Sequence, residues 1–287
     1  MGIYAFMERF FRICNKNIRV SSPVIPESSF IEEFSAQPSQ CNDISIEVNT
    51  TDSFIYPDCD LHFNNSGIAV IQKDATLCRY AKMGTDDGSV TTYSNNSSAH
   101  SETTVVKRNA HVLLGNRYFW TTVAFPQLML TENVLLFHAS FIEYKGQGII
   151  FSAPSGTGKS TQADLWQKYR NADIINGDKT GIIVEKGGVL ASGVPFCGTS
   201  GICKNRTVPL RAIVLLRQSP TNTVQRLTGA PAITELLKNV HLDFCAPDEQ
   251  RKCVDLLIEI ANSVPVLLLS CTPDENAVKA LEQELNI

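Results

Sequence analysis

The feature that most constrains this chain is the stretch GQGIIFSAPSGTGKSTQADLW, residues 146–166. An apolar run comes first, a turn rich in glycine and serine follows, and a segment with helical spacing completes it. This order predicts a buried strand that ends in a tight turn and leads directly into a helix. Apolar strands and helices continue to alternate after residue 105, which predicts an α/β fold of mixed α+β character.

The turn within this stretch is suited to holding a phosphate group. Gly156 and Gly158 permit positive φ, so the backbone can approach an anion closely with its N–H groups pointing inwards. The helix that begins near Lys159 adds unpaired N–H groups and the positive end of its dipole. These features predict a P-loop. Its nucleotide-binding residues are Ser155, Gly156, Thr157, Gly158, Lys159, Ser160 and Thr161.

Two side chains of the turn have specific predicted roles. Lys159 is expected to reach the β and γ phosphates as a point charge, and Ser160 to offer its hydroxyl to Mg²⁺. The common P-loop pattern has glycine at the position of Ala153, which an alanine with negative φ can also occupy. The alternative interpretation is a turn that only caps a helix.

A second candidate group follows 19 residues after Lys159, where the predicted strand ADIINGD ends on Asp178. Ligands of α/β sheets collect at the carboxyl ends of the strands. Asp178 is therefore predicted to bind Mg²⁺, directly or through water. The alternative is a turn aspartate that opens the hairpin of residues 180–193.

Two further segments carry candidate residues. His138 ends an apolar run one hairpin before the P-loop strand, and its alternative role is that of a structural histidine in the core. The segment 192–210 is rich in Gly, Ser and Thr and carries Lys204 and Arg206. Two cations in such a loop suit phosphoryl charge in a transition state. The alternative is a solvated surface loop.

Sequence patterns divide the chain in two. Residues 42–83 alternate as a series of strands, and the polar stretch 84–104 marks the expected boundary. We therefore predict a β-rich N-terminal region over residues 1–104 and a P-loop domain over residues 105–287. The first 16 residues are expected to form a short helix docked on the body, with an interfacial helix as the alternative.

Composition excludes several classes of protein. A formal net charge of −4 argues against a nucleic-acid binder steered by bulk charge. No apolar run reaches the roughly 18 to 20 residues of a membrane span. The nine cysteines include no C-x-x-C pair, which argues against a common zinc site. An odd number of cysteines without a signal peptide predicts reduced thiols and a cytoplasmic location.

The motifs HAS (138–140), FSAPSGTGKST (151–161) and NGD (176–178) together resemble a known family. Residues 134–217 are similar to the C-terminal catalytic region of HPr serine kinase/phosphorylases and to the nucleotide site of ATP-dependent phosphoenolpyruvate carboxykinase. The nearest resemblance is to small HPr-kinase-like proteins that accompany peptide-modifying gene clusters. It implies a P-loop core of this type that uses ATP and Mg²⁺.

The resemblance also implies residue roles. His138 would lie near the transferred phosphoryl group, and Asp178 would match the first of two adjacent acids. The second acid is replaced by Lys179, so three assignments stay open: Asp178 both binds metal and acts as the base, His138 assists, or Lys179 adds positive charge beside the phosphates. The predicted catalytic residues are Asp178, His138, Lys159 and Arg206.

These observations predict an ATP-dependent phosphotransferase whose acceptor is a hydroxyl of a peptide, a protein or a small molecule. Two alternatives come from other classes: a carboxykinase-like lyase, and a nucleotide-binding regulatory module that never transfers phosphate. No counterpart of the motif that contacts HPr is present, so HPr itself is not the implied acceptor. Because HPr kinases assemble into rings, the resemblance permits a homo-oligomer.

Overall fold

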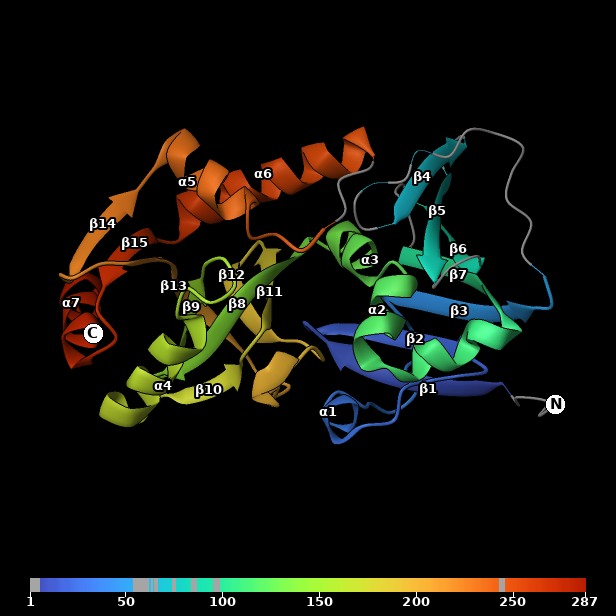
Figure 1. Ribbon diagram of the computed structural model, residues 1–287, viewed down its shortest axis with the longest axis horizontal. Helices are drawn as coiled ribbons and strands as arrows, with labels where there is room; N and C mark the ends of the chain where they lie inside the picture. Colours follow the sequence, from blue (N-terminus) through green and yellow to red (C-terminus); the bar gives the residue numbers. More distant parts are fainter. Residues whose placement is uncertain are drawn as a thin grey trace. The chain divides into compact units, whose positions relative to one another are not determined.

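The chain folds into two compact units, each built on its own β-sheet (Figure 1). The first unit comprises Met1–Glu132 and Leu242–Lys252, and the second comprises Asn133–His241 and Cys253–Ile287. This computed structural model describes residues 6–53, 62, 64, 67–73, 76–83, 87–94, 99–242 and 246–287. The boundary expected at 104/105 falls within a strand, whereas the units change at Glu132/Asn133. Because β7 (Ala99–Val106) is one continuous strand, the residues on both sides of the expected boundary belong to the same sheet. The polar composition of residues 84–104 did not reveal this.

The first unit contains, within the described residues, a seven-stranded sheet in the order β1-β2-β3-β7-β6-β5-β4. The strands are β1 (Met7–Ile13), β2 (Lys16–Ser22), β3 (Ile44–Thr51), β4 (Ile68–Lys73), β5 (Thr76–Met83), β6 (Asp87–Ser94) and β7 (Ala99–Val106). The helical segments are α1 (Ser29–Glu32), the 3₁₀ helix η1 (Lys107–Leu114), α2 (Asn116–Thr122) and α3 (Phe125–Thr131). The β-rich character predicted for residues 42–83 is visible in β3, β4 and β5.

The expected N-terminal helix is not formed, and β1 pairs with β2 in its place. The two residues between these strands, Cys14 and Asn15, have φ of 52° and 62°. Positive φ at both central positions is typical of the tight turn that matches the twist of a β-hairpin. Phe11 and Ile13 are buried on one side of β1 while Arg12 is exposed. The prediction failed because it relied on the apolar content of this segment and overlooked that apolar and charged residues alternate along it.

An aromatic cluster anchors α2 and α3 to the first sheet. Trp120 is fully buried, and its ring centroid lies 5.6 Å from that of Phe11, 5.3 Å from that of Phe119 and 4.7 Å from that of Phe125. Tilted and edge-to-face pairs of this kind stabilise a core beyond the area that they bury. The cluster therefore joins strand β1 to α2 and α3, the helices that come after β7 in the chain.

The second unit holds the sheet β10-β8-β11-β12-β13-β15-β14, in which β9 pairs with both β8 and β13. Its strands are β8 (Val134–Tyr144), β9 (Gln147–Ser152), β10 (Asp173–Asn176), β11 (Lys179–Glu185), β12 (Gly188–Gly193), β13 (Thr207–Gln218), β14 (Thr223–Leu227) and β15 (Val266–Cys271). The helical segments are α4 (Lys159–Arg170), η2 (Gly198–Ser200), α5 (Gly229–Leu237), α7 (Glu275–Leu285) and the part of α6 (Pro247–Ser263) from Cys253 onward, since its residues up to Lys252 belong to the first unit. Strands and helices alternate as predicted, and the α/β fold class is confirmed.

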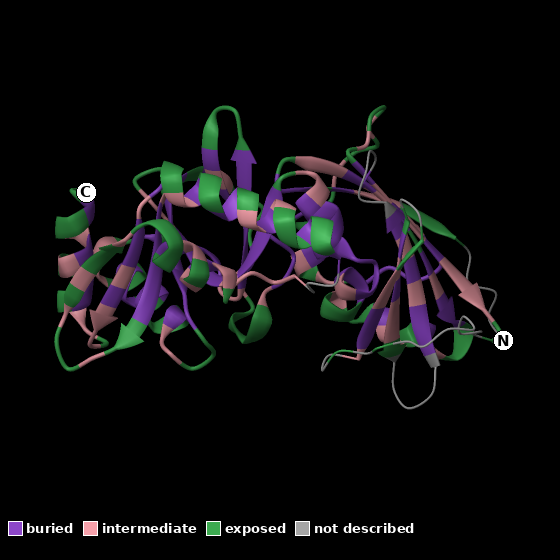
Figure 2. Cartoon of the chain, turned by 90° about the horizontal axis from the view of Figure 1, so that it is seen from above, coloured by how far each residue is buried: buried purple, intermediate pink, exposed green. Residues whose placement is uncertain are grey.

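Parallel pairing determines where a ligand can bind in this unit. Strands β9, β13 and β15 run parallel to one another, so their carboxyl ends meet at one edge of the sheet. Most residues of β8, β9 and β13 are buried, and the helices keep an exposed side (Figure 2). Helices α4 and α7 are tied together by Arg170, whose guanidinium donates to both carboxylate oxygens of Glu282 at 2.6 Å. The P-loop therefore extends from a rigid core.

Two observations bear on the classes that composition excluded. Among the described residues, no helix has the length and apolar character that a membrane crossing requires. The described cysteines are free thiols, namely Cys14, Cys41, Cys78, Cys197, Cys203, Cys253 and Cys271. Cys59 and Cys245 lie outside the described residues.

The aromatic cluster leads to a stability prediction that the two tryptophans make measurable, because Trp120 lies in the first unit and Trp166 in the second. In a Trp166→Phe background, Trp120 fluorescence reports on the first unit alone. Replacing Phe125 by Ala should lower the free energy of unfolding of that unit by about 3–5 kcal/mol in urea, because the cavity left behind cannot be refilled. Tyr118→Ala on the preceding helix α2, at a 61% exposed position, should change it by less than about 0.5 kcal/mol. Equal losses would contradict the cluster's role.

Candidate active site

The P-loop connects the end of β9 at Ser152 to the start of α4 at Lys159. Gly156 and Gly158 have φ of 79° and 116°, the left-handed values that the sequence required of them. A methyl group added at Gly156 would have no atom within 4 Å, so the loop faces open space. Ala153, at the expected glycine position, is not among the described residues with positive φ. The turn can thus present its N–H groups to an anion.

Lys159 is folded back over its own loop. Its Nζ donates to the carbonyl oxygens of Ala153 at 2.9 Å and Pro154 at 3.3 Å, and the residue is only 8% exposed. Burial lowers the pKa of Lys159 below its ordinary value, while the negative charge of Asp178 acts in the opposite direction. The cation of the P-loop and the carboxylate in the turn between β10 and β11 therefore share one electrostatic environment.

Asp178 is held by a buried asparagine that the sequence analysis did not single out. The side-chain oxygen of Asn176 accepts hydrogen bonds from the backbone N–H groups of Asp178 at 2.9 Å and Lys179 at 3.0 Å. Its amide nitrogen donates to the carbonyl of Val194 at 2.8 Å, and the residue is fully buried. Asparagine commonly closes turns in this way. The position of Asn176, two residues before Asp178, was the sequence signal that could have predicted this role in the turn.

The loop around η2 packs directly on this turn. A methyl group added at Gly198 would lie 2.7 Å from Cβ of Asp178, and one added at Gly177 would lie 2.6 Å from Cβ of Ser200. Only glycine at both positions allows such close approach. The segment 192–210, predicted to act through its cations, thus contributes instead by supporting Asp178 through glycine contacts.

His138 and Asp178, two of the predicted catalytic residues, lie next to each other. Nδ1 of His138 is 3.3 Å from Oδ1 of Asp178, and the two side chains are 37% and 28% exposed. Backbone hydrogen bonds fix both residues: the N–H of His138 donates to Asn239 at 2.9 Å, and that of Ala139 donates to the carbonyl of Asp178 at 3.0 Å. An acid and an imidazole in this arrangement can share or relay a proton.

Lys179, where the resemblance to HPr kinases implied a second acid, lies next to Asp178 and His138. It pairs with His138 across β11 and β8, and its Nζ lies 4.0 Å from Oδ2 of Asp178. The ammonium also lies 4.7 Å from the ring centroid of Phe196, a cation–π distance. At 5% exposure this lysine adds a buried positive charge next to Asp178.

Arg206 is not brought to this site, which corrects the expectation from the sequence. Its guanidinium donates to both carboxylate oxygens of Glu143, at 2.7 and 2.8 Å, and this pairing lowers the pKa of Glu143. Glu143 lies five residues beyond His138 on β8, about 17 Å along an extended strand. Lys204 likewise pairs with Asp173, which is opposite Glu143 in the register. Both cations of the segment are therefore engaged away from the P-loop.

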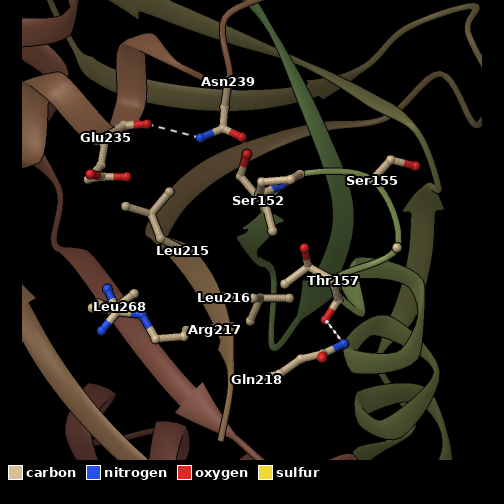
Figure 3. Close-up of a pocket in the computed structure, with 13 residues that line it drawn as sticks. Ser152, Ser155, Thr157, Leu215, Leu216, Arg217, Gln218, Glu235, Asn239 and Leu268 are labelled. Carbon is tan, nitrogen blue, oxygen red and sulfur yellow. Dashed lines mark hydrogen bonds between the residues drawn. The ribbon is translucent and has the colours of Figure 1, made fainter.

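Two cavities flank the P-loop. One of about 450 Å³ lies between the loop, the end of β13 and α5, and one of about 370 Å³ lies between the start of α4 and the ends of β13 and β15. Volumes in this range suit small ligands. Figure 3 shows the larger cavity, where Nε2 of Gln218 donates to the carbonyl of Thr157 at 3.4 Å and Asn239 donates to the carbonyl of Glu235. Sequence reasoning missed these polar residues, because no motif marks them.

The residues present fit a nucleotide and Mg²⁺. The loop faces open space with its glycines at positive φ, and Ser160 and Thr161 are exposed at the start of α4. Among the described residues, no group of three or more His, Cys, Asp or Glu side chains could hold a metal ion by itself. Mg²⁺ needs few protein ligands when a substrate supplies phosphate oxygens. One carboxylate and one hydroxyl, from Asp178 and Ser160, are the oxygen donors that suit it.

Strand, glycine turn, buried lysine and supporting acid together define a P-loop protein of the α/β class. The family model described as SynChlorMet cassette protein ScmC matches residues 119–286, more than half of the 287 residues, and the chain belongs to this family. The recognition made from the sequence, which named small HPr-kinase-like proteins of modifying gene clusters, is thereby confirmed.

The comparisons with curated proteins and solved structures add less. No curated protein matches the chain. Among solved structures, the HPr(Ser) kinase/phosphatase from Coxiella burnetii aligns at 12% identity over 53% of this chain and 99% of that chain, with a TM-score of 0.32. A likeness this weak assigns no reaction.

The buried position of Lys159 predicts a pH effect on stability. A lysine whose pKa is lowered by folding binds fewer protons in the folded than in the unfolded state, so its contribution to stability rises as pH increases toward its ordinary pKa. Wild type should therefore gain stability relative to Lys159→Met between pH 7 and 9.5. Urea unfolding followed by Trp166 fluorescence in a Trp120→Phe background measures this. A constant difference between the two proteins across this range would show that Lys159 keeps its ordinary pKa.

Proposed function

We propose that this protein is an ATP- and Mg²⁺-dependent phosphotransferase that moves the γ-phosphoryl group to a hydroxyl of a peptide, a protein or a small molecule. The observation that carries the proposal is the grouping of Lys159, Asp178 and His138. Asp178 acts on the charge of Lys159 and lies 3.3 Å from the imidazole of His138. A P-loop that only binds a nucleotide with its metal has use for the acid but no need of an imidazole beside that acid.

In the proposed reaction the acceptor hydroxyl attacks the γ phosphorus, its bond to phosphorus forms, and the bond to the departing diphosphate oxygen breaks. Asp178 takes the hydroxyl proton, and His138 orients the carboxylate through Nδ1. Lys159 leaves its carbonyl partners to balance charge on the phosphates. Mg²⁺, when bound, would neutralise phosphate charge beside Asp178 and Ser160. Most of the rate enhancement then comes from positioning and charge balance.

Lys179 has a defined part in this proposal. Its ammonium adds positive charge 4.0 Å from Oδ2 of Asp178, while the imidazole of His138 lies 3.3 Å from Oδ1. The proton-accepting carboxylate is thereby held between a lysine and an imidazole, in place of the two adjacent acids that the family resemblance implied. A homo-oligomer remains a prediction from that resemblance alone.

One alternative has an observation in its favour, namely a nucleotide-binding regulatory module that does not transfer phosphate. The second acid is replaced by Lys179, and Arg206 is engaged by Glu143 instead of the site. Incubation with γ-labelled ATP, Mg²⁺ and serine- or threonine-containing peptides separates the two functions. A phosphotransferase labels an acceptor or releases labelled phosphate, whereas a regulatory module binds ATP and leaves the label in place.

The roles of Asp178 and His138 predict an order of damage. Asp178→Asn should lower the rate of label transfer by at least about 10²- to 10⁴-fold, the usual worth of a general base. His138→Asn should lower it less, and both variants should keep most of their affinity for ATP. Arg206→Gln is the matched control and should leave the rate within about twofold, because its partner Glu143 lies far from the P-loop. If His138→Asn is the more damaging change, the imidazole is the base.

Glycine contacts allow a second test that leaves every polar group in place. Gly198→Ala places a methyl group 2.7 Å from Cβ of Asp178 and should displace the carboxylate. Gly229→Ala is its control, since both glycines have similar positive φ, 55° and 60°, but a methyl group at Gly229 meets nothing within 4 Å. ATP should raise the melting temperature more with Mg²⁺ than with EDTA in wild type and Gly229→Ala. That Mg²⁺-dependent increment should shrink in Gly198→Ala, and its survival there would remove Asp178 from the metal site.

A further inference from the structure

The two cavities beside the P-loop differ in what they adjoin. The larger one, here called the α5 cavity, is lined by Ser152 and Asn239, and both residues bond to the backbone of His138. Oγ of Ser152 donates to the carbonyl of His138 at 2.8 Å, and the N–H of His138 donates to the carbonyl of Asn239 at 2.9 Å. No described residue that lines the smaller cavity, at the start of α4, hydrogen-bonds to His138. A hydroxyl that reacts beside His138 and Asp178 therefore has the α5 cavity next to it.

Strand β13 directs one charged side chain to the α5 cavity. Leu215 pairs with Ser152, the last residue of β9, and Arg217 follows two residues later, about 7 Å further along an extended strand. Successive side chains of a strand point to opposite faces of the sheet. Accordingly, Leu215 and Arg217 line the α5 cavity and not the smaller one, whereas Leu216 and Gln218 line both. Arg217 therefore lies at the carboxyl edge of the sheet, in the cavity that adjoins His138.

Arg217 is a charge without a partner of its own. It is exposed, and it makes no hydrogen bond or ion pair with any residue that the structure describes. The other charged residue among the described lining of the α5 cavity is Glu235, whose carboxylate lies 2.6 Å from Nζ of Lys238. An arginine in this situation keeps its five N–H donors available for a ligand.

The place of Arg217 in the cavity suits a group other than the phosphates. Figure 3 shows Arg217 and Glu235 on the side of the cavity opposite Ser155 and Thr157 of the P-loop. In the proposed function the phosphates are held by the N–H groups of that loop and by Lys159, so they do not need this second cation. A guanidinium is planar and forked, which matches a carboxylate through two parallel N–H···O hydrogen bonds.

We propose that Arg217 determines acceptor specificity by binding a carboxylate of the acceptor. This inference rests on the proposed phosphotransfer and names its substrate class, a hydroxyl compound that carries an acid. The hydroxyl would lie beside Asp178 and His138, and the carboxylate would lie against Arg217, across the α5 cavity from the P-loop. Two sources offer this chemistry: a peptide with an acidic residue close to its reactive serine or threonine, and a small hydroxy acid.

Transfer from γ-labelled ATP to matched peptides tests the proposal on the wild-type protein. Each peptide contains a single serine, and the paired peptides differ only by a glutamate or a glutamine at one position near it. At the best position the glutamate peptide should have a kcat/KM about two- to fivefold higher, through a lower KM, as expected for an exposed ion pair. Glycerate and glycerol form the corresponding small pair. A preference for glycerate, with no label on any peptide, identifies a small hydroxy acid as the acceptor.

Charge exchange at Arg217 carries the mutational test, because this exposed side chain can be replaced without opening a gap in the core. Arg217→Gln should equalise the glutamate and glutamine peptides. Arg217→Glu should reverse the preference, so that a lysine at the same peptide position becomes better than a glutamate. The KM for ATP should stay unchanged in both variants.

The matched control is Arg226→Gln. Arg226 is an exposed arginine of β14 that is not among the described residues lining the α5 cavity, and it too makes no hydrogen bond or ion pair with a described residue. The preference for the glutamate peptide should survive this change. Its loss in Arg226→Gln would mean that the preference comes from the overall surface charge and not from Arg217.

The outcomes separate this inference from the proposed function. Equal kcat/KM for each glutamate and glutamine pair, with equal rates for glycerate and glycerol, would overturn the inference and leave phosphotransfer in place. A preference that survives Arg217→Gln would also overturn it, and so would a higher KM for ATP in that variant, which would assign Arg217 to the nucleotide.

If no acceptor is labelled, the proposed function fails, and peptide binding decides the inference. Fluorescence anisotropy of the labelled peptides without ATP should then still show tighter binding of the glutamate peptide, and Arg217→Gln should remove the difference. Equal binding of the two peptides by the wild-type protein would overturn the inference as well.

Discussion

Backbone pairing along β8 is the constraint on which the candidate site depends. Residues Val134–His138 pair with β11, while Phe141–Glu143 pair with β10. The turn that joins these two strands must therefore pass His138, and this turn carries Asp178. On its other side β8 pairs with β9, whose end is the P-loop. One strand thus aligns the acid, the imidazole and the phosphate turn through main-chain hydrogen bonds, so that positioning does not rely on flexible side chains.

Hydrogen bonds and close packing hold the periphery of the site, and its centre carries buried positive charge. Asn176 satisfies the backbone of the turn, and Gly198 packs without a gap against Asp178. In contrast, Lys159 and Lys179 are cations held almost out of water, 8% and 5% exposed. Burying charge costs stability unless partners compensate it. A polyphosphate would supply that compensation, which is the usual relation between binding sites and local instability.

The cations of segment 192–210 illustrate why the composition of a loop does not by itself assign a role to its charged residues. Lys204 and Arg206 look like phosphate ligands because they follow a loop rich in glycine. In the fold, Lys204 donates its N–H to the carbonyl of Ile175, and both side chains meet the acids Asp173 and Glu143 at the far end of β10 and β8. An extended strand separates its ends by about 3.3 Å per residue, so a few residues decide whether a cation reaches the site.

The sequence by itself determined the P-loop, the alternation of strands and helices, and the acid at the end of the next strand. Each follows from local chemistry: positive φ needs glycine, period-two or period-3.6 patterns select the element, and apolar runs select burial. Only the tertiary structure decided that His138 meets Asp178, that Asn176 and Gly198 hold the turn, and that Arg206 is elsewhere. These depend on strand register and on contacts between residues distant in sequence, and a shift of two residues along a strand would change them without altering any local pattern.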